Sequence, residues 1–102
     1  MLNKVKIGWK EYDVVSKPSA LNSGEELMGQ IDFDRQIITL RDSNTKEQNE
    51  STLIHEILHG IGNMYGINLD EETVTRLADA IYTIVKDNPS LRFEERTGKE
   101  RD

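Results

Sequence analysis

The amino-acid sequence predicts an α+β fold in which a small antiparallel sheet, made of two N-terminal hairpins, packs on two helices. Short runs rich in β-branched and aromatic residues, separated by turn residues, occupy the first 41 positions. Two longer segments, which begin near positions 45 and 70, carry apolar residues at the period of a helix. With 102 residues the chain is long enough for one modest core, so we expect a single domain over residues 1–102.

The first hairpin is predicted around the segment from Gly8 to Glu11. Apolar residues in the two short runs that flank this turn fall at alternating positions: Val5, Ile7, Trp9, Tyr12 and Val14. We expect both Trp9 and Tyr12 to lie in the core or on a face of the sheet. Residues 17–26 contain Pro, Ser, Asn and Gly without periodicity, which predicts a loop that could hold one helical turn.

A second hairpin is predicted over residues 27–41. Ile31 and Phe33 precede the turn at Asp34, and Ile38 and Leu40 follow it, with polar residues between the apolar ones. This alternation predicts strands with one buried face and one face in water.

The first helix is predicted to run from about Thr45 to about Asn63. Asn44, followed three positions later by Glu47, has the form of a helix start, and Gly66 offers a C-terminal stop. The apolar positions form one stripe along the helix: Leu53, Ile54, Ile57, Leu58 and Ile61.

The second helix is predicted to begin at the N-cap Asp70 and to end at Asn88, which precedes a proline. Its apolar residues have the period of a buried face: Val74, Leu77, Ala78, Ile81, Ile84 and Val85. After this helix the chain becomes highly charged, so we expect the tail from about 94 to 102 to be disordered.

Composition and charge narrow the classes of partner. The formal net charge is −6, and the basic residues are not gathered into a stripe, so we expect no nucleic-acid partner. No apolar run has the length of a membrane span, and residues 1–10 lack the apolar core of a signal peptide. We therefore expect a soluble, cytoplasmic protein without a membrane partner.

Two histidines, the only two of the chain, lie four residues apart at positions 55 and 59 with Glu56 directly after the first. On a helix this spacing places both imidazoles on one face, about one turn apart, where they can share a metal ion. Imidazole nitrogen suits Zn²⁺, whereas Ca²⁺ and Mg²⁺ prefer oxygen ligands. Glu56 then has the position of a general base. A chance occurrence is the alternative, but polar residues inside an apolar run usually have partners.

A third zinc ligand must be a carboxylate, because the chain has no cysteine and no further histidine. Glu71 and Glu72, at the start of the second helix, are the main candidates. Glu71 shares the phase of Val74 and the buried stripe, whereas Glu72 is placed to form a surface ion pair with Arg76. Helical phase favours Glu71 over Glu72.

The motif from His55 to His59 resembles that of the zincin metallopeptidases, in which both histidines bind zinc and the Glu activates a water molecule. The run EETVTRLADAIY, residues 71–82, is similar to the Glu-x-x-Ala-x-x-Phe-Ala segment of the ImmA/IrrE family and its short phage-encoded relatives. The resemblance covers residues 45–88. It implies a minimal zincin-like fold with Glu71 as third zinc ligand and Glu56 as catalytic base, and hydrolysis of peptide bonds in a specific intracellular protein.

Other features of the predicted site have more than one interpretation. An extended substrate would pair with an edge strand of the second hairpin, residues 28–41. Tyr65 and Tyr82 are possible donors to the oxyanion, although tyrosines at such positions more often serve packing. The alternative function is that of a zinc-binding regulatory or interaction protein of a phage or mobile element, without turnover. A DNA-associated SprT-like protease shares the motif but would need a basic surface and a zinc ribbon.

Overall fold

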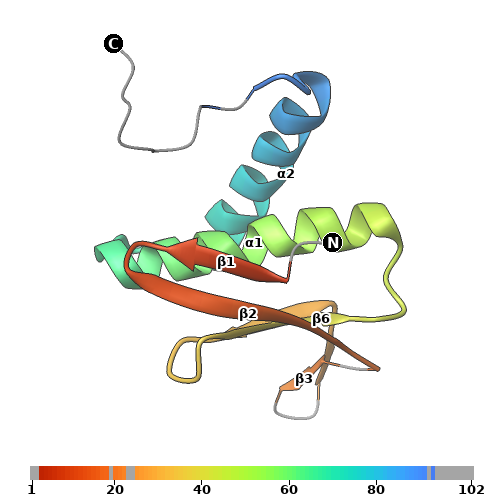
Figure 1. The fold of residues 1–102 in the computed structure, drawn as a ribbon, viewed down its shortest axis with the longest axis vertical. Coiled ribbons are helices and arrows are strands. Elements are labelled where there is room, and N and C mark those ends of the chain that lie inside the picture. Colours follow the sequence, from red (N-terminus) through yellow and green to blue (C-terminus); the bar gives the residue numbers. More distant parts are fainter. Residues whose placement is uncertain (1–2, 19, 23–24, 92, 94–102) are drawn as a thin grey trace.

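The computed structural model describes residues 3–18, 20–22, 25–91 and 93, and it has the α+β architecture that the sequence predicts (Figure 1). Its elements, in chain order, are β1 (Lys4–Ile7), β2 (Lys10–Lys17), β3 (Ala20–Asn22), β4 (Glu25–Leu27), β5 (Gly29–Asp32), β6 (Ile37–Arg41), α1 (Lys46–Tyr65) and α2 (Glu71–Asp87). The tail predicted to be disordered, residues 94–102, lies outside the described residues.

The main sheet has four strands in the order β1-β2-β6-β5. Both predicted hairpins are present, since β1 pairs antiparallel with β2, and β5 pairs antiparallel with β6. The hairpins join, however, through parallel pairing of β2 with β6, from Asp13 opposite Ile37 to Lys17 opposite Arg41. The sheet is therefore mixed, and the prediction of a purely antiparallel sheet is wrong. The apolar strand β6 takes a central place, where Ile38 and Leu40 are buried, and leaves the more polar β5 at the edge.

The segment between the two hairpins is not the predicted loop. Its described residues form a small second sheet, in which β3 and β4 pair antiparallel from Ala20 opposite Leu27 to Asn22 opposite Glu25. Strands of three residues are too short to show a period of two, so hydrophobic patterning could not predict them.

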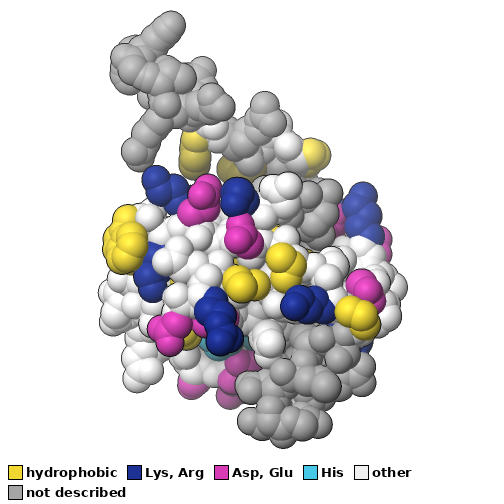
Figure 2. All heavy atoms as spheres, turned by 60° about the horizontal axis from the view of Figure 1, so that its bottom comes forward, with side chains coloured by type: hydrophobic (Ala, Val, Ile, Leu, Met, Phe, Trp, Pro, Cys, Tyr) yellow, Lys and Arg dark blue, Asp and Glu magenta, His cyan; other side chains and the backbone are white. Residues whose placement is uncertain are grey.

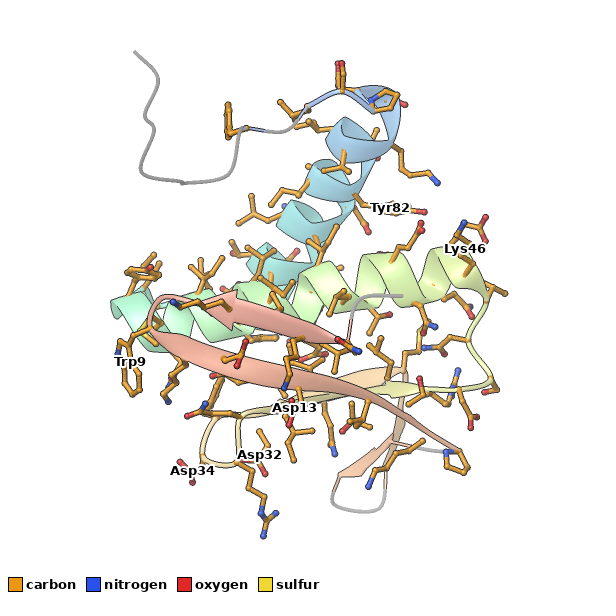
Figure 3. The ribbon with its side chains drawn as sticks, viewed as in Figure 1. Trp9, Asp13, Asp32, Asp34, Lys46 and Tyr82 are labelled. Carbon is orange, nitrogen blue, oxygen red and sulfur yellow. The ribbon has the colours of Figure 1, made fainter. Side chains whose placement is uncertain are left out.

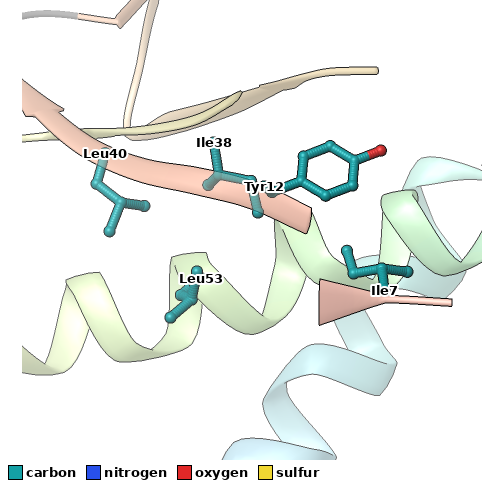
Figure 4. Close-up of a cluster of buried hydrophobic side chains, with 5 residues drawn as sticks. All are labelled: Ile7, Tyr12, Ile38, Leu40 and Leu53. Carbon is teal, nitrogen blue, oxygen red and sulfur yellow. The ribbon is translucent and has the colours of Figure 1, made fainter. Parts of the chain in front are cut away.

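One face of the main sheet packs on α1 and forms the larger core. Its buried members come from four elements and lie between sheet and helix in Figure 4: Ile7, Tyr12, Ile38, Leu40 and Leu53. Tyr12 lies in the core, as expected, whereas Trp9 lies neither in the core nor on a face of the sheet, because it stands between β1 and β2 and is 74% exposed. Trp9 follows Gly8 in a two-residue turn, where strand alternation has already ended.

A capping box marks the start of α1, and its N-cap lies one position after the predicted cap residue. Thr45 is the N-cap, its hydroxyl accepts a hydrogen bond from the Gln48 N–H, and the Gln48 side chain accepts one from the Thr45 N–H. Asn44 instead donates to the Met28 carbonyl and so joins the helix start to the sheet. Gly66, with φ of 67°, ends the helix as predicted.

Helix α2 begins at the predicted N-cap, since Asp70 accepts a hydrogen bond from the Thr73 N–H, and it is followed by Asn88. Val74 and Ala78 are buried against α1 together with Leu58, in a second core. Of the rest of the predicted buried face, Ile81 packs on this core, whereas three residues are exposed: Leu77, Ile84 and Val85. Figure 1 shows the reason, because α2 crosses α1 near its own N-terminus and then extends away from the sheet.

The surface shows no segregation of charge on the face in Figure 2, where acidic and basic side chains are intermingled. Within the part of the chain that the structure describes, neither helix combines the length and the apolar character that crossing a membrane requires.

Candidate metal centre

The two histidines lie near the middle of α1, on the side that faces α2. Their ring centroids are 5.0 Å apart and the rings are inclined by 61°. Both side chains are partly buried, because α2 crosses the helix beside them. The spacing of four residues thus places both rings on one face, as the sequence predicts.

Glu71 reaches both histidines from the first position of α2. One carboxylate oxygen, Oε2, is 2.8 Å from Nε2 of His55, and Oε1 is 2.9 Å from Nε2 of His59. The cap at Asp70 fixes the start of α2, and buried Val74, one turn later, holds that start against α1. The Glu71 side chain is nevertheless 70% exposed, so its predicted place in the buried stripe is wrong.

Glu72, the alternative third ligand, does not approach the histidines. Its carboxylate is 2.8 Å from the Arg76 guanidinium, in the surface ion pair that helical phase predicts. The structure therefore brings together His55, His59 and Glu71 and leaves Glu72 outside the cluster.

The geometry of the three side chains fits a metal ion. One ligand atom from each residue can be chosen so that all three lie within 4.8 Å of one another. Ligands at about 2.0–2.2 Å from a tetrahedral Zn²⁺ would be roughly 3.5 Å apart, so the Glu71 carboxylate, now at hydrogen-bond distance from both imidazoles, would have to move outward by about half an ångström to admit the ion. Two imidazoles and one carboxylate are also a donor set that catalytic zinc uses, with a further position left for water.

Glu56 lies beside this cluster and is buried, with 7% of the residue exposed. Burial, and to a smaller extent the negative charge of Glu71, raise the pKa of its carboxyl to about 7. No hydrogen bond or ion pair within the described residues holds this carboxylate. Glu56 can therefore accept or release a proton near neutral pH, and a cation bound by the cluster would lower its pKa.

The cluster opens into a groove of about 980 Å³. Three elements form the walls of this groove. Helix α1 contributes Gln48, Thr52 and other residues of the same face, and β5 and α2 form the other two walls. Gly29 lets β5 approach α1 closely, because a Cβ at this position would lie 2.6 Å from Cγ2 of Thr52. The groove therefore runs between the edge strand and the two helices.

The two tyrosines that the sequence offers as oxyanion donors have different places. Tyr65 is exposed at the end of α1 and does not line the groove. Tyr82 does line it, but its hydroxyl donates a 2.9 Å hydrogen bond to Glu50, which raises the pKa of Tyr82 and lowers that of Glu50. The Tyr82 hydroxyl is thus committed to a neighbouring carboxylate.

No family model matches this sequence, and no curated protein and no solved structure matches it significantly. The candidate site consequently depends on residue types, spacing and geometry in this chain alone.

Sequence reasoning missed two carboxylates that line the groove away from the cluster, Glu47 and Asp79. A signal for them was present in the spacing. Glu47 lies eight residues before His55, and Asp79 lies eight residues after Glu71, which is a rotation of about 80° on a helix and places each carboxylate at the edge of the face that carries the metal ligand. Recognising it required knowing how the two helices cross.

Proposed function

We propose that this protein is a zinc-dependent metallopeptidase that hydrolyses peptide bonds of a specific protein in the cytoplasm. The observation that carries the proposal is the convergence of His55, His59 and Glu71 next to the buried, unpaired carboxyl of Glu56, at the wall of an open groove. A site that served only to stabilise the fold would have no use for a titratable base beside the metal and would not face a groove.

Zinc held by these three residues would supply a water molecule of lowered pKa and would polarise the carbonyl of a peptide bond. Glu56 is placed to accept a proton from that water as its oxygen bonds to the carbonyl carbon, and it would deliver the proton to the nitrogen of the amine as the C–N bond breaks. Burial raises the pKa of the Glu56 carboxyl and a bound cation would lower it, so with the metal in place the carboxyl would be ionised, as a base must be. His55, His59 and Glu71 would hold the metal ion beside the Glu56 carboxyl.

The open edge of β5 supports an extended peptide as the substrate. β5 is the last strand of the sheet order, and the Arg41 N–H donates to the Met28 carbonyl at its start. Because hydrogen-bonded and outward-facing residues alternate along an antiparallel pair, the peptide groups of Gly29 and Ile31 face away from β6, toward the open edge. A peptide could pair with these groups and place a carbonyl near the histidines.

The test compares wild type with Glu56→Gln, both loaded with one equivalent of zinc, in extract of the native host. New protein termini, detected by mass spectrometry, should appear with wild type and be absent with Glu56→Gln, because the amide cannot accept the proton. Glu72→Gln is the matched control, since it makes the same change at an exposed position outside the cluster. Identical termini with wild type and Glu56→Gln would refute the proposal.

An interaction protein without turnover is the second candidate, and one observation favours it. Leu77, Ile84 and Val85 expose apolar side chains along α2, and Leu91 and Phe93 beyond it are exposed too. Such residues commonly mark a binding surface. If Glu56→Gln captures the same host protein as wild type in pull-downs and neither protein generates new termini, this second function replaces the first.

A further inference from the structure

The charged side chains that line the groove are acidic. Among the described residues around it, the carboxylates are Glu47, Glu56, Glu71 and Asp79, and no lysine or arginine contributes to the lining. Glu56 and Glu71 belong to the metal centre. Glu47 and Asp79 remain as two negative charges without a role in the proposed chemistry.

These two carboxylates lie toward the same end of the groove. Glu47 is two turns and a fraction before His55 on α1, and Asp79 is equally far beyond Glu71 on α2, which corresponds to about 12 Å along each helix. Tyr82 connects the two helices there, since its hydroxyl contacts Glu50, and the charge of Glu47 contributes to the raised pKa of Tyr82. Figure 3 shows Tyr82 above the half of α1 that begins at Lys46.

Neither carboxylate is neutralised by the protein itself. Glu50, their neighbour, is paired, because Lys86 lies 3.6 Å from it and Tyr82 donates to it. Glu47 and Asp79 are exposed, and within the described residues no hydrogen bond or ion pair engages either side chain. Lys46 adds a positive charge near Glu50 but does not line the groove. This end of the groove therefore has solvent-exposed negative charge that no side chain of the described residues neutralises.

A second, independent feature of the groove indicates which class of ligand would bind beside these carboxylates. The free edge of β5 forms the opposite wall, and Gly29 and Ile31 present unpaired peptide groups along it, which fit an extended chain. An extended chain advances about 3.3 Å per residue, so 12 Å corresponds to three or four residues. Glu56, buried and unpartnered in the same groove, marks where the bond to be cleaved lies.

We infer that the groove selects an extended peptide with a lysine or arginine three or four residues from the cleaved bond, held between Glu47 and Asp79. The inference rests on the proposed function for the position of the cleaved bond, but the charge preference itself is a property of binding. Glu47 on α1 and Asp79 on α2 line the groove from two sides, so both add to the negative potential that a cationic side chain would meet there, and phosphate-bearing ligands would be repelled.

The test measures binding without cleavage. A library of random eight-residue peptides is passed over immobilised, zinc-loaded Glu56→Gln protein, and retained and unretained peptides are sequenced by mass spectrometry. Lysine and arginine should be enriched about fivefold at one position of the retained pool, since two exposed charge pairs at about 0.5 kcal/mol each give this ratio. Raising the salt concentration should reduce the enrichment.

Two further variants, both made in the Glu56→Gln protein, test whether Glu47 and Asp79 cause the preference for basic residues. Adding Glu47→Gln and Asp79→Asn should abolish the enrichment, whereas adding Glu72→Gln and Asp87→Asn, which changes net charge equally outside the groove, should preserve it.

The inference is overturned if retained peptides show no preference for basic residues, or if the preference persists without Glu47 and Asp79. Cleavage by wild type without a basic preference would contradict this inference alone. A basic preference without any cleavage by wild type would contradict the proposed function alone.

Discussion

At the scale of single residues, Glu71 and Glu72 give the sharpest comparison, because adjacent carboxylates at the start of α2 have separate environments. Glu71→Ala should weaken zinc binding at least tenfold, since it removes one of three convergent ligands. Glu72→Ala should change it less than twofold, because that side chain forms only an exposed ion pair with Arg76. Competition with a chromogenic chelator measures both affinities, and the opposite ranking would move the ligand by one residue.

Glu56 should make the stability of the metal-free protein depend on pH. Its pKa is about 7 in the folded protein and 4.5 in the unfolded chain, so folding favours its protonated form. The resulting stability is fully present below pH 4.5 and is lost as pH rises through 7. At about 1.4 kcal/mol per pKa unit, the loss amounts to at most roughly 3 kcal/mol.

Urea denaturation in the presence of a chelator, between pH 5 and pH 8, measures this effect as the difference between wild type and Glu56→Gln. The glutamine variant lacks the titrating group, so its stability should fall less over the range, and contributions from all other groups cancel in the comparison. Parallel curves for the two proteins would mean that burial does not shift the carboxyl.

At the scale of elements, the cap of α2 should control the metal centre. Asp70 accepts the hydrogen bond of the Thr73 N–H and thereby sets where α2 begins, one residue before Glu71. Asp70→Ala should fray that first turn and weaken zinc binding several-fold, although Asp70 itself is not a ligand. Asp70→Asn should restore the affinity, because asparagine caps equally well. The same chelator titration measures the zinc affinity of both variants. An equal loss of affinity in the two would mean that the charge of Asp70, and not its capping hydrogen bond, supports the site.

Signals that act over a few residues made the helices and the His-Glu-x-x-His site predictable. The sequence locates the stop at Gly66 and the cap at Asp70 correctly, whereas the N-cap of α1 is Thr45 and not Asn44, because the side chain of Asn44 bonds to the Met28 carbonyl instead. The parallel pairing of β2 with β6 depends on which strand of a hairpin takes the centre, and no local pattern encodes that choice. For the same reason the sequence could not show where α2 leaves the body of the protein.

At the scale of the whole molecule, zinc should stabilise the fold by joining two helices. The ligands come from α1 and α2, so an ion bound to the folded state cross-links them, and binding at a hundredfold excess over Kd adds about 2.7 kcal/mol. Thermal denaturation should show a higher melting temperature with zinc than with chelator. The double variant His55→Ala, His59→Ala should show no such shift, and an unchanged wild-type curve would contradict a site between the helices.

Helix α1 belongs to two cores at once. One of its faces packs on the sheet around Leu53, and another packs on α2 through Leu58, while Ile61 contacts both clusters. Among the described elements, α2 makes its extensive contacts with α1, so the helical pair and the sheet are joined mainly through this shared helix and through Ile61. A smaller side chain at Ile61 should therefore weaken the coupling between the two cores, so that the sheet wall of the groove loosens before the two helices that carry the ligands separate.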